Sequence, residues 1–245
     1  MYFTISAISF TEGMHWLLDR FKSKHESKSL KILTGHRVHS ITNDSGSIMI
    51  GYQHRDTLGE ARYDKVISAL PAHALAILLE KSLPETSGLL QKVQYYPVGI
   101  AIAKYRDEVF PENRRAMIFD RGTPLSNAGA YGVNDLDMVR YTFSGKTSRK
   151  LISENSDPEK VIELGEKITT PFFNIKDNFK EGFVYRYFTK GLCAYSSKHH
   201  LLLDKIDVNL KSIPGFRATG DYRRGASIEA CFRAACECVD KVIGD

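Results

Sequence analysis

The stretch GFRATGDYRRGASIEACFRAACECVDKVIGD (residues 215–245) decides the fold that we expect for this chain. Phe216–Thr219 is predicted to form a strand that runs straight into a turn made by Gly220 and Asp221. A glycine here allows a backbone to approach a ligand closely, and the Asp221 carboxylate can accept hydrogen bonds from hydroxyl groups. The alternative interpretation is an ordinary strand–turn–helix, with the glycine needed only for the turn.

The turn leads into a predicted helix for which Ser227 is a good N-cap. The free N–H groups and the positive dipole end of that helix suit a phosphate or an electron-rich carbonyl oxygen. Apolar and small side chains recur at helical spacing and predict one buried face. They are Ile228, Cys231, Phe232, Ala235, Cys238 and Val242.

The composition bounds the class of protein. A chain of 245 residues fits one large domain or two small ones. The sequence contains no run of about 18 apolar residues, which is the length that a membrane-spanning helix needs. The net charge is +5, but basic and acidic residues are interspersed, which gives nucleic-acid binding little support. Three of the four cysteines lie together on the final helix, so we expect reduced thiols and a cytoplasmic location rather than a disulfide framework.

No metal site is predicted. The adjacent residues His199 and His200 begin a predicted helix, where consecutive side chains point about 100° apart. No acidic pattern accompanies them, so we expect both to be solvated.

The rest of the chain predicts alternating helices and strands and hence an α/β (α+β) fold. The predicted helices are Thr11 to about Lys24 with an apolar face that includes Met14, then Ala72–Glu80, Thr86–Val93, Asp157 toward Phe173, and His199–Ile213. The predicted strands are a small antiparallel meander (Leu30–Thr34, Val38–Thr42, Ser47–Tyr52 and Ala61–Tyr63), Val66–Leu70, Val98–Tyr105, strands between 116 and 145, and Val184–Phe188. Ser144–Lys160 is expected to be an exposed linker before the helix at Pro158.

Several segments together resemble a known family. The order and spacing of these segments are similar to those of FAD-dependent amine oxidases and protoporphyrinogen oxidases. The segments are the run IPGFRATGDYRRGASIEACFRAACECVDKV, the helix FTEGMHWLLDRF, the pair ILTGHRVHSITND and YDKVISALPAHAL, and YRYFTKGLCAYSSKHHLLLDKI. The resemblance covers about two thirds of the chain. It implies a partial FAD-binding layer of the Rossmann-like type, plus a mixed-sheet substrate domain.

The resemblance also implies positions for the cofactor-binding residues. The backbone of Val38 would lie near the adenine, and Pro71 at the edge of the dinucleotide site, although ordinary packing explains either residue equally well. The other positions form the turn and the start of the last helix, toward the pyrophosphate, ribityl chain and flavin ring: Gly220, Asp221, Gly225, Ser227 and Ile228.

Substrate-facing candidates follow from the same resemblance, and no catalytic residue is assigned. Ala101 stands where many amine oxidases carry a lysine, and Ala226 where they often carry an aromatic residue. Both departures favour the protoporphyrinogen-oxidase or desaturase-like branch over simple amine oxidation. Tyr187 replaces a tryptophan of the family pattern, and Tyr195 is the best candidate to face a substrate, with a half-buried aromatic as the alternative.

The family's G-x-G-x-x-G fingerprint does not occur in the sequence. The chain therefore resembles the C-terminal portion of the family, with flavin-side segments at 1–93 and 200–245 and a substrate domain at 94–199. Three explanations compete: an enzyme split over two polypeptides, a truncated or degenerate copy, and a misread resemblance. The first implies an FAD-dependent oxidoreductase that oxidises a C–N or C–C bond, completed by a partner chain that carries the fingerprint. A cofactor-less interaction module of the same fold is the alternative.

Overall fold

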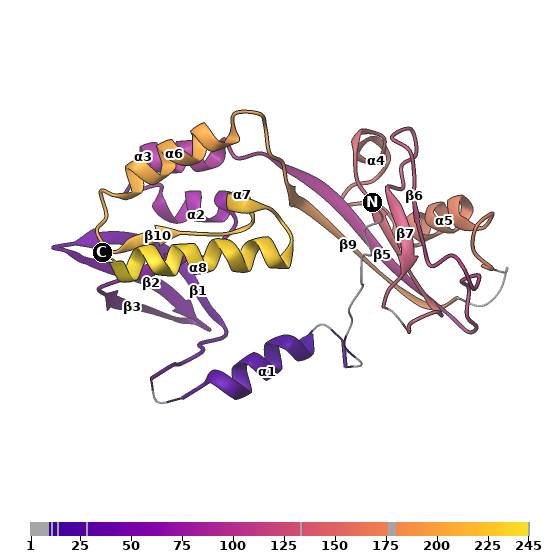
Figure 1. The fold of residues 1–245 in the computed structure, drawn as a ribbon, viewed down its shortest axis with the longest axis horizontal. Helices are drawn as coiled ribbons and strands as arrows, with labels where there is room; N and C mark the ends of the chain where they lie inside the picture. The colour runs from indigo at the N-terminus through magenta and orange to yellow at the C-terminus, as the bar shows by residue number, and fades with distance from the viewer. Residues whose placement is uncertain are drawn as a thin grey trace, which may run out of the picture. The chain divides into compact units, whose positions relative to one another are not determined.

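The computed structural model describes residues 10, 12–13, 15–27, 29–132, 134–175 and 180–244 (Figure 1). The helices are α1 (His15–His25), α2 (Ala72–Leu79), α3 (Pro84–Gln91), α4 (Lys146–Leu151), α5 (Pro158–Thr169), α6 (His199–Leu210), α7 (Asp221–Arg224) and α8 (Ile228–Gly244). The strands are β1 (His36–Asp44), β2 (Ser47–His54), β3 (Thr57–Tyr63), β4 (Val66–Ser68), β5 (Tyr95–Tyr105), β6 (Ala116–Ile118), β7 (Asn127–Ala130), β8 (Met138–Phe143), β9 (Lys180–Cys193) and β10 (Phe216–Ala218). Helices and strands are mixed along the chain, which confirms the predicted α/β class.

The chain divides into two compact units, and each is described by itself. The first unit comprises Met1–Ile32 and Tyr96–Gly191, and the second comprises Leu33–Tyr95 and Leu192–Asp245. Two of the three junctions between the units fall inside long strands, β5 and β9. The second unit is therefore assembled from two pieces of sequence, with most of the first unit inserted between them.

The second unit contains two sheets. β1, β2 and β3 form an antiparallel meander, as predicted, in which Ile41 lies opposite Ile50 and Ile50 opposite Ala61. β4 and β10 form a separate parallel pair, with Phe216 opposite Val66. Within the part of the chain that the structure describes, this pair has no third strand, so β4 and β10 each keep one free edge.

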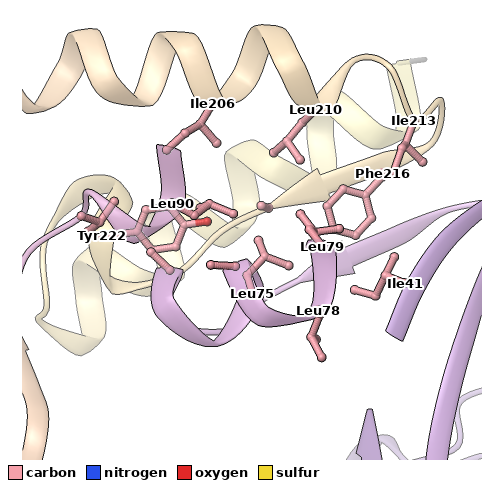
Figure 2. Packing of buried hydrophobic residues seen from close by; sticks show 14 of the residues in the cluster. Ile41, Leu75, Leu78, Leu79, Leu90, Ile206, Leu210, Ile213, Phe216 and Tyr222 are labelled. Carbon is pink, nitrogen blue, oxygen red and sulfur yellow. The ribbon is translucent and has the colours of Figure 1, made fainter. Parts of the chain in front are cut away.

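The core of the second unit is built around the parallel pair. Figure 2 shows Leu75 and Leu79 of α2, Ile206 of α6 and Phe216 of β10 gathered in one cluster. Tyr222 of α7 is fully buried in the same cluster. This packing fixes the two strand ends relative to α2 and α7, and those ends carry the candidate site.

The first unit is a five-stranded sheet in the order β6-β7-β8-β5-β9, with α5 packed on one face. Tyr141 of β8 lies against Gly165 of α5, where an added Cβ would come within 2.7 Å of the ring. The hydroxyls of Tyr105 and Tyr141 are 2.8 Å apart, and Tyr105 also donates to Glu166 Oε1 at 2.9 Å. Gly165 therefore permits the close helix–sheet approach that brings Glu166 to the two tyrosines.

Several sequence predictions were wrong, for identifiable reasons. Leu30–Thr34 is not a strand, because the alternation of apolar residues there has no neighbouring strand to pair with among the described residues. Ser144–Lys160 is not an exposed linker, because α4 forms within it and buries Ser148 and Ile152. The mostly polar sequence of α4 has no apolar pattern from which a helix could be predicted. The Arg149 guanidinium of this helix stacks over the ring of Tyr96, 4.6 Å from its centroid.

The two end helices also differ from prediction. α1 exists, but none of its described residues is buried, so the predicted apolar face is not covered; Thr11 and Met14 lie outside the described residues. On α8, Cys238 and Val242 are buried as expected, whereas Ile228 and Phe232 are 59% and 64% exposed. The buried face of α8 is therefore narrower than its apolar face.

Candidate functional site

The turn after β10 is held against the end of β4. Thr219 N donates to Ser68 O at 2.8 Å, which continues the parallel pairing by one residue. Gly220 has a φ of 142°, and a Cβ added there would lie 2.9 Å from the Leu70 carbonyl oxygen. Pro71 follows Leu70 and caps α2, its carbonyl accepting from Leu75 N at 3.1 Å. The two strand ends thus meet without room for a side chain at position 220.

Asp221 is the centre of a hydrogen-bonded cluster. Its Oδ1 accepts from the Tyr95 hydroxyl at 2.7 Å, and that hydroxyl in turn accepts from Ala72 N at 3.1 Å. The backbone carbonyl of Asp221 accepts from the Tyr195 hydroxyl. Burial raises the pKa of Tyr95 well above its usual range, and the Asp221 carboxylate adds to the rise. Tyr95 therefore remains a neutral donor that orients the carboxylate and joins it to the start of α2.

His199 supports this cluster and corrects a prediction. The imidazole is buried, not solvated, and its Nε2 lies 2.6 Å from the carbonyl oxygen of Tyr222. The ring also packs edge-on against Tyr195, with centroids 5.3 Å apart. The chain folds back so that α6 begins beside α7, which buries His199. The neighbouring His200 is exposed, and the local sequence does not distinguish the two histidines.

The cysteines are free, as expected from the sequence. Burial raises the pKa of the Cys193 thiol, and the nearby Asp221 carboxylate raises it further. The pKa of Cys231 is raised by the same two causes. Both thiols are therefore held in the protonated, weakly nucleophilic form. Of the two cysteines predicted on the buried face of α8, Cys238 is buried and Cys231 is half-buried, whereas Cys236 is exposed.

The start of α8 has the predicted cap. Ser227 Oγ accepts from Ala230 N at 3.1 Å. Gly225 has a φ of 138°, and its carbonyl accepts from the Cys231 thiol at 3.6 Å. Ala226 and Ile228 are exposed, so this end of the helix is open to a ligand or to another chain.

The remaining candidates lie elsewhere. Val38 is half-buried on β1, beside an irregularity in the β1–β2 register, and packs against the core of the second unit. Ala101 and Tyr187 belong to the first unit, where Ala101 is fully buried and Tyr187 packs on the same core. The structure therefore brings together Pro71 and the turn from Gly220 to Ser227, with Tyr195. Val38 lies in the same unit but outside that cluster, and Ala101 and Tyr187 belong to the first unit.

Tyr95 and His199 were missed as members of the site. Tyr95 reaches Asp221 across 126 residues of sequence, and no local spacing connects them. The family resemblance identified Asp221, the partner of Tyr95, and Tyr195, which packs against His199. It gave no sign of Tyr95 or His199 themselves. Among the described residues, no group of three or more metal-binding side chains occurs, and no helix is long and apolar enough to cross a membrane.

The site is a parallel strand pair whose carboxyl ends carry a glycine turn, a carboxylate and a capped helix. The model of the family of flavin containing amine oxidoreductases matches residues 1–243, and the chain belongs to that family.

Solved structures with the same fold are similar over nearly the whole chain. One is a candidate protoporphyrinogen oxidase from Exiguobacterium sp. 255-15, with a TM-score of 0.74 and 16% sequence identity. Another is a reduced UDP-galactopyranose mutase, with a TM-score of 0.73 and 16% identity. Each likeness covers 95% of this chain and 51% of the other, so the chain spans about half the length of these structures. No curated protein matches the sequence.

The orienting role of Tyr95 is testable. Tyr95→Phe leaves the buried Ala72 N–H without its acceptor and Asp221 without its donor, so we expect the free energy of unfolding to fall by about 1–3 kcal/mol. Urea unfolding measures the change. Tyr96→Phe is the matched control, since the ring of Tyr96 is retained against Arg149. Equal stability of the two variants would remove Tyr95 from the cluster.

Proposed function

We propose that this chain is a subunit of an FAD-dependent oxidoreductase that removes a hydride from a C–N or C–C bond of a small molecule. Family membership supports a flavin chemistry, and the observation that carries the proposal is the turn at Gly220 and Asp221. A backbone that cannot hold a side chain lies next to an oriented carboxylate at the carboxyl ends of two parallel strands. That is where dinucleotides bind in open α/β sheets.

The residues present fit the ribityl and pyrophosphate part of such a cofactor. Asp221 Oδ1 is fixed by Tyr95, and its other carboxylate oxygen remains available to accept from a hydroxyl group. Ser227 caps α8, which leaves N–H groups and a positive dipole end at the exposed start of that helix. When bound, FAD supplies the two-electron acceptor. The chain's own groups hold and orient it, and a protonated Cys193 nearby adds no competing nucleophile.

We further propose that a partner polypeptide completes the site with the G-x-G-x-x-G unit. The free edge of β10 supports this, because a parallel strand pair is normally enclosed by further strands and helices. The exposed apolar side chains of α8 support it as well. An interface of this kind resembles a domain core cut in two, so we expect it to bury roughly 2,000 Å² or more.

In this proposal the chain works in the cytoplasm, where its four free thiols stay reduced. Residues 1–93 and 200–245 would serve the flavin side and residues 94–199 the substrate. Tyr195 and Ala226 would lie nearest to a substrate in the second unit.

The test is an absorbance scan of the purified chain, alone and after co-expression with a protein that carries the fingerprint. Alone, the chain is expected to purify colourless and self-associated; with its partner it should form a stable heterodimer, or a dimer of heterodimers, with about one FAD per pair. Stoichiometric FAD in the chain alone would contradict the split-enzyme proposal. A well-behaved flavin-free monomer with cooperative unfolding would favour the second candidate, a cofactor-less interaction module. In such a module the contacts of Tyr95 and His199 would be purely structural.

A further inference from the structure

A groove with a volume of about 820 Å³ runs along the open edge of β10 in the second unit. Arg217, Ala218 and Thr219 all line it, although consecutive side chains of a strand point to opposite faces. β10 pairs with β4 along one edge and has no strand along the other among the described residues. The groove, called the edge groove below, therefore borders the strand from the side and not from one face.

Helices on both faces of the strand pair form the walls of the edge groove. α6 packs in the same core cluster as Phe216 and Ala218 of β10. α8 also contacts β10, but its own buried residues, Ala234 among them, are not part of that cluster. α6 and α8 therefore lie on opposite sides of β10 (Figure 1). The edge groove occupies the place that the next strand of the sheet would take.

The backbone of β10 presents hydrogen-bonding groups to the edge groove. Thr219 N donates to Ser68 O and thus faces β4. Alternate residues of a parallel strand turn their N–H and C=O groups to opposite neighbours, so those of Ala218 face the edge groove. The Phe216 carbonyl on the same edge accepts from Arg217 Nη1 at 2.8 Å, whereas the Ala218 groups have no partner within the described parts of the chain. Such an edge is a template for pairing with another strand.

The charges along the edge groove favour an acidic occupant. Arg223 Nη1 lies 2.7 Å from Asp207 Oδ1. Arg224 Nε lies 2.7 Å from Glu237 Oε2, so these two pairs neutralise each other. Three cations and one carboxylate remain in the lining, a balance of +2. They are Lys211, Arg217, Lys241 and Asp204.

The two walls differ in character. The α6 wall contributes the apolar side chains of Leu203 and Leu210. Lys241 belongs to the α8 wall, and Arg217 points to the α8 side because it alternates with Ala218. A strand in the edge groove would therefore meet apolar groups on one of its faces and cations on the other.

We infer that the edge groove binds an extended, acidic segment of another polypeptide, which adds to β10 as a third strand. Its backbone would bond to the N–H and C=O groups of Ala218. Its acidic side chains would point toward Lys241 and its apolar ones toward Leu203. A second copy of this chain is a poor occupant, because its β10 would bring the same cations together. The inference concerns a different feature from the Asp221 cluster and holds whether or not a flavin binds there.

The experiment measures the fluorescence anisotropy of a labelled hexapeptide of alternating glutamate and valine, titrated with the full chain at constant ionic strength. We expect saturable binding of one peptide per chain, and much weaker binding of the corresponding lysine–valine peptide. Two further peptides carry N-methyl groups on the glutamates or on the valines. Because alternate N–H groups of a strand face opposite sides, one of these peptides should lose about tenfold or more in affinity and the other should bind like the parent.

Variants of the chain test the same contacts from the other side. Ala218→Pro removes the N–H that faces the edge groove but no hydrogen bond to β4, so it should weaken binding about tenfold. Lys241→Glu should also weaken binding about tenfold or more. Lys205→Glu is the matched control, because it makes the same charge change on α6 outside the edge groove, and it should bind like the unaltered chain.

If Ala218→Pro does not fold, the N-methylated peptides test the strand edge without altering the chain. Absence of saturable binding of the acidic peptide would overturn the inference. So would equal affinities of the acidic and basic peptides, equal affinities of the two N-methylated peptides, or a Lys241→Glu variant that binds like Lys205→Glu.

Discussion

Gly220→Leu is expected to lose most of the bound flavin from the complex, at least about tenfold in cofactor content after gel filtration. The new side chain would point at the Leu70 carbonyl oxygen, 2.9 Å from its Cβ, and at the Tyr222 ring, 3.1 Å away. Because the Leu70 carbonyl follows β4 and the Tyr222 ring is buried in the core, the turn must move away from β4 to accept the leucine, which displaces the Asp221 backbone that follows. The φ of 142° adds backbone strain for any residue with a side chain.

The control separates strain from position. Gly46→Leu imposes a positive φ of 90° on a leucine in the β1–β2 turn, where an added Cβ meets nothing within 4 Å. It should lower the stability of the chain through backbone strain alone and leave the flavin content unchanged. Retention of flavin and activity by Gly220→Leu would make Gly220 a turn residue and no more.

Phe232→Asp is expected to abolish assembly with the proposed partner chain, with a loss of affinity of about a hundredfold or more for a well-packed aromatic anchor. Ile228, Phe232, Val239 and Ile243 are 59%, 64%, 41% and 74% exposed. At 3.6 residues per turn they lie within an arc of about 60° on α8. This apolar stripe continues the buried face of the helix, so a carboxylate introduced into it would be desolvated by any chain that covers it.

The same variant should leave the isolated chain folded and less prone to self-association, since Phe232 makes little use of the chain's own core. Light scattering with size exclusion measures both effects. Arg233→Asp places the same carboxylate on the next residue, outside the stripe, and should assemble normally. If Phe232→Asp assembled as well as Arg233→Asp, the partner would dock elsewhere or would not exist.

The elements predicted correctly are those whose formation depends on residues close together in the sequence. The meander, α2, α3, α5 and the β10–turn–α8 succession follow from alternation, capping and turn residues that lie within a few positions of each other. The Asp157 side chain, for example, accepts from Glu159 N at 3.0 Å at the predicted start of α5. The Ser227 cap was identified by the same reasoning.

What failed was decided by distant parts of the chain. Whether Ile228 and Phe232 are buried depends on what packs against α8, and spacing along a helix cannot distinguish a covered from an uncovered apolar face. The burial of His199 depends on where α7 lies, and α4 forms although its residues are mostly polar.

The interrupted layout of the second unit has a consequence for how the protein is made. Val66 pairs with Phe216, and Tyr95 with a carboxylate 126 residues further on, so this unit has high contact order. During synthesis, β4, α2 and α3 leave the ribosome long before β10, α7 and α8. The sheet of the first unit lies between them in sequence, so it is complete before β10 is made. The first unit should therefore fold early, and the apolar faces of α2 and β4 should remain exposed to chaperones until β10, α7 and α8 have been synthesised.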